Sequence, residues 1–268
     1  MFSTEQFRKL IDQVNTKIEN KDHQVNVDEL INNEIGGVLD FGIWSETVQM
    51  QTEFNNKVAP GWMHDIQNVK YDFWMAILDE TTEVLNSKHW KWWKDSTKHG
   101  DVDWTNVRVE LVDLFHFILS LTIQQKNEQL LFASFINFEI NEVTKKDRLI
   151  RDENYFKEFW DLFLMAVQIK SLPLVAVKWV EFWYRAGYNA EDLFKDYRIK
   201  NMLNKLRQKY GYGAKNNYKK MWPGIQENKL VEDNVIAWEI AKDMPLTKEF
   251  NAEFFDKLEE YYLKYVAI

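Results

Sequence analysis

The chain of 268 residues carries 34 basic and 42 acidic side chains, so its formal net charge at pH 7 is −8. This acidic balance argues against general nucleic-acid binding, which needs a positive surface. The absence of cysteine excludes disulfide bonds and thiolate metal sites, and no apolar run reaches the roughly 18 residues that a membrane span requires, so we expect neither a nucleic acid nor a membrane as partner.

The first 42 residues are expected to form an N-terminal extension, a helix followed by a loop. The amphipathic opening MFSTEQFRKLIDQ predicts a helix that ends near Asn20, and Gly36, Gly37 and Gly42 indicate the loop after it. The opening lacks the apolar core of a signal peptide. We therefore expect a cytoplasmic protein, or one of the nucleus or an organellar matrix if the source is eukaryotic.

Residues 43–268 predict one all-α domain. Hydrophobic residues make up 46% of the chain, only nine Gly and four Pro interrupt it, and strand-type alternation is scarce. Helices are predicted at about 43–56, 69–85, 106–125, 129–144, 153–169, 173–186 and 190–210, with one or two more within 231–265. We expect a short helix and a loop in the tryptophan-rich segment 89–106, and a loop at 211–222.

Two pairs of acidic residues stand three positions apart in otherwise apolar predicted helices: Glu80 with Glu83, and Glu110 with Asp113. The polar residues of the second helix recur at steps of three, three and four: Glu110, Asp113, His116 and Ser120. This spacing places them on one face of the helix. Carboxylates are rarely buried unless they are paired or bind a metal, so the four acids predict a site for a divalent cation.

The chemistry of these ligands favours Mg²⁺ or Mn²⁺, which prefer oxygen donors. A di-iron bundle would need Glu-x-x-His motifs on facing helices, and His116 alone does not supply them. A structural alternative is that the acids accept hydrogen bonds from Lys, Arg or Trp side chains.

Basic and amide side chains follow on the predicted helix at 190–210 and in the loop after it. Lys200, Asn204 and Arg207 lie near one side of the helix end, and Lys219 follows in the loop. Such groups suit the capture of phosphate. A solvated basic face is the alternative interpretation.

Aromatic and amide residues indicate where a planar base could bind. The segment HWKWWK contains Trp90, Trp92 and Trp93, which could stack on a base or fill a core or a dimer contact. Gln51 and Asn55, four residues apart on one predicted helix, could read the amide edge of a pyrimidine. Alone they would be unremarkable surface residues.

In chain order, these motifs resemble one family, the dimeric all-α dUTPases. The resemblance rests on the segments MQTEFN, LDETTEVLNSKHWKWWK, NVRVELVDLFHFILSL, LFKDYRIKNMLNKLRQKYGY and YKKMWPGIQEN, which span residues 50–228. The family often closes its last motif with Glu-Asp-Asn, where this chain has Gln226, Glu227 and Asn228.

The resemblance implies a homodimer that hydrolyses dUTP to dUMP and pyrophosphate, by attack at the β-phosphate, and that also hydrolyses dUDP. It implies two or more Mg²⁺ ions, with Mn²⁺ possible, at the ligands Glu80, Glu83, Glu110 and Asp113. One of these carboxylates would act as general base toward the attacking water, and we assign this role to Glu80, although the sequence leaves the choice among the four open. It implies uracil-binding residues, namely Gln51, Asn55 and Trp92. It implies residues that line the base and deoxyribose, His116 and Phe117. It implies phosphate contacts from Lys200, Asn204, Arg207, Tyr212 and Lys219.

Two alternatives remain open from the sequence. One is a related enzyme that hydrolyses dCTP or another deoxynucleotide. The other is a non-catalytic helical protein that binds or regulates a partner. The four clustered acids count against the second, because a pure binding protein has no need to hold like charges together.

Overall fold

The structure, a computed structural model, describes residues 41–94, 97, 99–140, 154–212, 218–225 and 229–267. The expected N-terminal helix and nearly all of the loop after it lie outside these residues. The described part is helical apart from turns, loops and one two-stranded sheet, which confirms the all-α class. None of its helices is both long and apolar enough to cross a lipid bilayer.

The elements have these bounds in chain order: α3 (Phe41–Val58), η1 (Trp62–His64), α4 (Phe73–Asn86), α5 (Trp104–Gln124), α6 (Glu128–Ile140), α7 (Asn154–Glu158), the π-helical η3 (Phe159–Phe163), α8 (Leu164–Gln168), α9 (Leu172–Arg185), α10 (Ala190–Lys209), β1 (Met221–Pro223), β2 (Leu230–Glu232), α11 (Asp233–Ala241) and α12 (Phe250–Tyr265).

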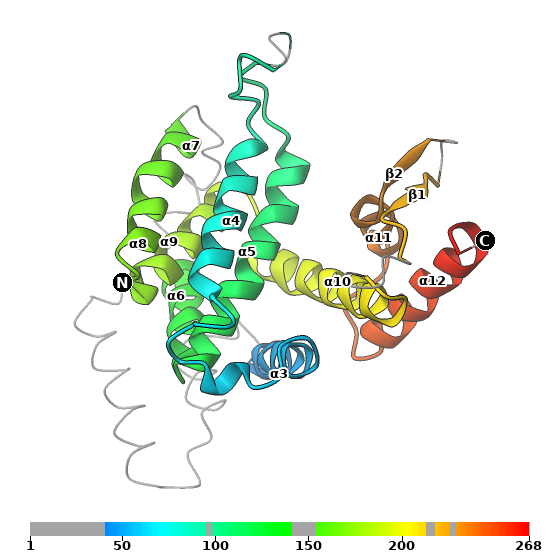
Figure 1. Ribbon diagram of the computed structural model, residues 1–268, viewed down its shortest axis with the longest axis horizontal. Coiled ribbons are helices and arrows are strands. Elements are labelled where there is room, and N and C mark those ends of the chain that lie inside the picture. The colour runs from blue at the N-terminus through cyan, green and yellow to red at the C-terminus, as the bar shows by residue number, and fades with distance from the viewer. Residues whose placement is uncertain are drawn as a thin grey trace, which may run out of the picture.

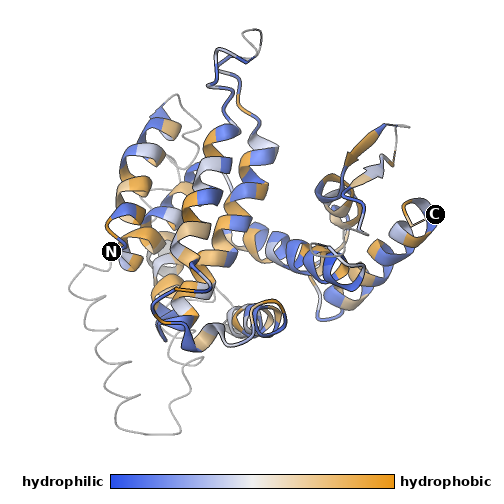
Figure 2. Cartoon of the chain, in the orientation of Figure 1, coloured by the Kyte–Doolittle hydropathy of each residue, from blue (hydrophilic) through white to orange (hydrophobic). Residues whose placement is uncertain are grey.

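A helical bundle forms one half of the molecule and contains α4 to α9 (Figure 1). Helix α5 is its central member, since it packs on α3, α4, α6, α9 and α10. The ring of Phe115 on α5 lies 5.0 Å from that of Trp179 and 5.7 Å from that of Tyr197, and all three side chains are fully buried. This aromatic core holds in place the helix that carries the polar stripe. Figure 2 shows apolar residues gathered on the bundle helices.

Helix α10 leaves the bundle and joins it to a C-terminal module, residues 218–267, which contains β1, β2, α11 and α12 (Figure 1). A capping box begins α10, because Asn189 and Asp192 each accept the backbone N–H of the other. Helix α10 packs on α3 and on α5 of the bundle, and on α11 and α12 of the C-terminal module. Side chains from both halves therefore meet along α10.

Helix α4 begins at Phe73 rather than near residue 69. The carboxylate of Asp65 accepts the backbone N–H groups of Val69, Lys70 and Tyr71, and this turn delays the helix. Asp72 then caps α4 by accepting the N–H of Met75 at 3.0 Å.

One further prediction of local structure was wrong, and one element was not predicted. Among the described residues of 87–103 there is no short helix: this segment is an arm whose two sides are joined by one β-bridge between Lys88 and Val102 (Figure 1). The antiparallel pair β1–β2 was not predicted, because strands of three residues give no detectable alternation.

Candidate functional site

Two adjoining cavities lie along α4, α5 and α10. The first, about 480 Å³, is lined by α3, α4, α5 and α10, and we call it the α3 cavity. The second, about 820 Å³, is also lined by α11, and we call it the α11 cavity. Five residues line both: Glu80, Asp113, Lys200, Arg207 and Tyr212. A ligand long enough to occupy both cavities would therefore pass these five side chains.

The predicted acidic residues meet where the two cavities join. Helices α4 and α5 pack side by side, and Glu80, Glu110 and Asp113 can each place an oxygen atom within 4.8 Å of the others. These three side chains are half-buried, and Glu83, which lines the α11 cavity, is exposed. The acids are therefore more open to solvent than their apolar sequence context suggested.

The electrostatics of this cluster fit a bound divalent cation. Burial and the charges of Asp113 and Glu110 raise the pKa of Glu80 to about 8, and burial and Asp113 raise the pKa of Glu110 to about 7. The ammonium group of Lys200 lies 2.6 Å from a carboxylate oxygen of Asp113. One lysine does not balance several acids, so the cluster needs further positive charge to be fully ionised. A set of oxygen donors is the type that Mg²⁺ and Mn²⁺ prefer.

The α3 cavity contains a different kind of polar group. Gln51 and Asn55 of α3 line it and are only 2% and 5% exposed. Their side chains donate to the hydroxyl oxygen of Ser120 on α5 at 3.0 and 2.8 Å, and the hydroxyl of Tyr197 on α10 donates to Gln51 at 3.0 Å. Three helices thus hold a neutral network at this end.

His116 also lines this cavity and has a buried acceptor nitrogen. Its Nδ1 lies 2.8 Å from the carbonyl of Val112, which can only accept, so Nδ1 carries the hydrogen and Nε2 has a lone pair. Burial lowers the pKa of His116 to about 4, so the ring is neutral at pH 7. Among the described residues Nε2 has no hydrogen-bond partner although it is buried. Phe117 lines the cavity beside it.

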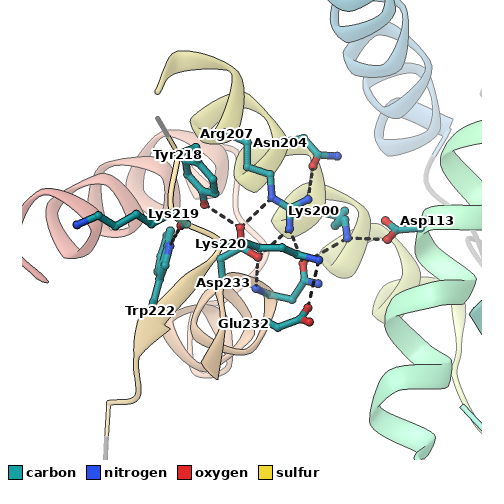
Figure 3. Close-up of polar contacts among 11 residues, drawn as sticks. Asp113, Lys200, Asn204, Arg207, Tyr218, Lys219, Lys220, Trp222, Glu232 and Asp233 are labelled. Atoms are coloured by element: carbon teal, nitrogen blue, oxygen red, sulfur yellow. Dashed lines mark hydrogen bonds and ion pairs between the residues drawn. The ribbon is translucent and has the colours of Figure 1, made fainter. Parts of the chain in front are cut away.

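Arg207 lies where α10 meets the C-terminal module (Figure 3). Its Nε and Nη2 donate to the two carboxylate oxygens of Asp233 at 2.8 and 2.7 Å, and Tyr218 donates to the same carboxylate at 2.8 Å. Asp233 is fully buried. Nη1 of Arg207 donates to Asn204 at 3.2 Å. Asp233 therefore fixes the guanidinium group from the side of the C-terminal module, and Arg207 lines both cavities.

Comparison with known proteins identifies the family of the chain. A family model described as dUTPase matches residues 43–212, well over half of the chain. The chain belongs to the all-α dUTPase family. Membership makes it an enzyme, a dUTP diphosphatase, and hydrolysis of dUTP its general reaction. No curated protein matches the chain. The family match ends before the C-terminal module, so Asp233 lies beyond it.

Two of the predicted site residues of this dUTPase lie away from both cavities. Lys219 donates to the carbonyl of Val266 at 2.8 Å, and Figure 3 shows it directed away from Asp113, whereas its neighbour Lys220 lines the α11 cavity. Trp92 is on the arm, 66% exposed, and lines neither cavity. The remaining predicted residues line one cavity or both: Gln51, Asn55, Glu80, Glu83, Glu110, Asp113, His116, Phe117, Lys200, Asn204, Arg207 and Tyr212.

Other groups at the candidate site were not predicted as such. Asp233 holds Arg207, and Asn234 accepts from Lys200 at 3.3 Å. Together with Glu232 these residues form a Glu-Asp-Asn sequence, whereas residues 226–228, compared above with the closing motif of the family, lie outside the described residues. A search for a Glu-Asp-Asn sequence after residue 228 would have identified Asp233 and Asn234. Ser120 belongs to the polar stripe seen in the sequence, but no pattern there assigned a role to Ser120 or Tyr197, and neither lines the α3 or the α11 cavity.

Proposed function

We propose that the enzyme hydrolyses dUTP to dUMP and pyrophosphate in a Mg²⁺-dependent reaction, and that it also hydrolyses dUDP. The observation that carries this proposal is the order of groups along the cavities. A neutral, amide-lined end comes first, the acids follow, and Lys200 and Arg207 lie next to them. A deoxynucleotide has the same order, from its neutral base to its charged phosphates.

The acids Glu80, Glu83, Glu110 and Asp113 would hold two or more Mg²⁺ ions, with Mn²⁺ as an alternative. Bound there, the ions would neutralise the triphosphate and lower the pKa of the attacking water. Glu80 accepts a proton from that water as general base, and attack occurs at the β-phosphate.

The remaining side chains bind and orient the nucleotide. Gln51 and Asn55 bind uracil, while His116 and Phe117 face the base and the deoxyribose. An apolar ring beside C2′ excludes a ribose hydroxyl. The phosphates are held by Lys200, Asn204, Arg207 and Tyr212, with Lys220 and Asn234 added by their position in the α11 cavity.

We further propose a homodimer in which Trp92 of one copy meets the nucleotide bound by the other. Trp90, Trp92 and Trp93 are 43%, 66% and 56% exposed on the arm, and large exposed aromatic groups are typical of interaction surfaces. Residues 43–268 would form the nucleotidohydrolase domain and residues 1–42 its N-terminal extension.

The test is product analysis with a complete set of nucleotides. The protein is freed of metal with a chelator and incubated with each deoxynucleoside triphosphate, dUDP and UTP, before and after addition of Mg²⁺ or Mn²⁺. We expect dUMP and pyrophosphate from dUTP only when metal is added. Faster turnover of dCTP would favour the related dCTP hydrolase instead. Absence of turnover with every nucleotide and both metals would overturn the proposal.

A further inference from the structure

The side-chain amides of Gln51 and Asn55 can discriminate between pyrimidines only if each is held in one orientation and cannot flip by a half-turn. A primary amide carries an acceptor oxygen and a donor NH₂ group, and a half-turn exchanges them with little change in shape. Uracil presents an N3–H donor between two carbonyl oxygens, whereas cytosine has a lone pair at N3 and an amino donor at C4. A freely turning amide would therefore accept either base.

Ser120 fixes the direction of the NH₂ groups of Gln51 and Asn55. Its hydroxyl donates to the backbone carbonyl of His116, one turn earlier on α5, at 2.7 Å. Having used its single hydrogen, the Ser120 oxygen can only accept from other groups. Gln51 and Asn55 approach it at 3.0 and 2.8 Å, so both must turn their NH₂ groups towards it.

Tyr197 fixes the direction of the side-chain oxygen of Gln51. The side-chain NH₂ of Asn201 donates to the Tyr197 oxygen at 3.4 Å, so the hydroxyl hydrogen of Tyr197 is available for an acceptor. The oxygen of Gln51 lies 3.0 Å away and the carbonyl of Thr47 3.3 Å away. The nearer acceptor is Gln51, whose oxygen is therefore fixed opposite its NH₂ group.

The network leaves a defined set of groups for a ligand. Gln51 uses both N–H bonds, one to Ser120 and one to the oxygen of Asn55 at 3.0 Å, so it can only accept. Asn55 keeps one N–H. An acceptor at Gln51 suits the N3–H of uracil and opposes the N3 lone pair of cytosine, while the Asn55 N–H suits a uracil carbonyl.

We propose that Ser120 and Tyr197 are positioning residues that select uracil over cytosine, although neither lines the cavity. Both are fully buried, and they act by holding the amides of Gln51 and Asn55 in one orientation. The inference rests on the proposed function, since it concerns how the proposed uracil-binding residues are held.

The test compares kcat/KM for dUTP and dCTP in the full-length protein with Mg²⁺. Ser120→Ala and Tyr197→Phe each remove one of the two constraints on the amides, so the dUTP/dCTP ratio of kcat/KM should fall about tenfold in each variant, the size of effect expected from one neutral hydrogen bond. The ratio should fall further in the double variant.

Two matched controls remove similar buried hydroxyls that do not touch the network. Thr122 lies two residues after Ser120 and donates to Leu119 at 2.8 Å; Tyr155 donates to Phe182 at 3.0 Å. Thr122→Val and Tyr155→Phe should lower the melting temperature as much as the test variants do, without altering the ratio. The two test variants are independent, so either one that folds decides the question.

The outcomes separate this inference from the function on which it rests. An unchanged ratio in a folded Ser120→Ala or Tyr197→Phe protein, with wild type active and selective, overturns the inference alone. Equal use of dUTP and dCTP by wild type also overturns it and leaves nucleotide hydrolysis standing. A wild type inactive on every nucleotide overturns both.

Discussion

The α3 and α11 cavities solve the problem of burying polar groups in opposite ways. Apart from the charged side chains that also line it, the α3 cavity has neutral amide groups on its α3 wall, where Gln51 and Asn55 hydrogen-bond to each other and to Ser120 behind them. The α11 cavity is lined mainly by charged side chains, and its acids outnumber its cations: Glu80, Glu83, Asp103, Glu110, Asp113, Glu232 and Glu239 against Lys200, Arg207, Lys220 and Lys242.

The difference shows which end is complete without a ligand. Neutral groups can be buried at low cost once each has a hydrogen-bond partner, so the first network can be rigid in the free protein. Clustered carboxylates repel one another and resist ionisation, so the second end depends on the charges that a ligand and its ions bring. We therefore expect selectivity at the first end and turnover at the second.

The largest effect should follow from Glu80→Gln, which removes a charge from the acidic end. We expect kcat for dUTP to fall by about 10²–10⁴-fold, because the general base is lost. The melting temperature should stay the same or rise slightly, because burial and Asp113 raise the pKa of Glu80 and its charge therefore opposes folding.

The matched control for this variant is Asp79→Asn, since Asp79 is the exposed neighbour of Glu80 and lines neither cavity. It should turn over dUTP as wild type does. Steady-state kinetics and thermal melting of both variants are the measurements, and a Glu80→Gln enzyme within tenfold of wild type would exclude Glu80 as the base.

Asp233→Asn should come next, because it releases Arg207 from its bidentate partner. We expect kcat/KM for dUTP to fall by roughly 10²-fold, the penalty of a misplaced binding group. Stability should also fall, by about 3–5 kcal/mol, since a buried arginine loses its counter-charge.

Asp196→Asn is the control that separates the loss of kcat/KM from the loss of stability. Asp196 is also buried on an arginine, Arg108, whose Nη2 lies 3.1 Å from it, but it lines neither cavity. It should destabilise the protein to a similar degree and leave KM for dUTP near the wild-type value. If the two variants lose activity in proportion to stability, Asp233 has only a structural role.

Phe117→Ala addresses sugar selection at the neutral end. Removing the ring opens space for a ribose 2′-hydroxyl, so the preference for dUTP over UTP should shrink by roughly 10–200-fold, the usual limit of steric exclusion by an apolar wall. Values of kcat/KM for dUTP and UTP in wild type and variant give the result. A constant ratio would assign sugar selection to another residue, such as His116.

Trp92→Ala should give the smallest effect, and only on binding. With 66% of the side chain exposed, its loss should hardly change the melting temperature, whereas loss of stacking on uracil should cost about 1–3 kcal/mol of affinity. Calorimetric titration with a non-hydrolysable dUTP analogue measures this, and Trp93→Ala is the control. Equal affinity in wild type and Trp92→Ala would remove the arm from the base site.

The sequence by itself determined most of the helices and the two acidic pairs, because both depend on local spacing. A helix repeats every 3.6 residues, so Glu110, Asp113 and His116 share a face whatever packs against it. The same reasoning put Gln51 and Asn55 together on α3, and their mutual hydrogen bond is local. The ordered motifs then identified the family without any contact between helices.

Only the tertiary structure decided which groups meet across helices. Gln51 and Tyr197 are 146 positions apart and touch because α3 and α10 pack together, and no local pattern encodes that contact. The same holds for Lys219 and Lys220, adjacent residues of which only the second lines a cavity, and for Trp92, which the arm carries away from α3. Packing of distant segments selects one arrangement among many that satisfy the same periodicity, and the hydrogen-bond partners of the site are fixed at that step.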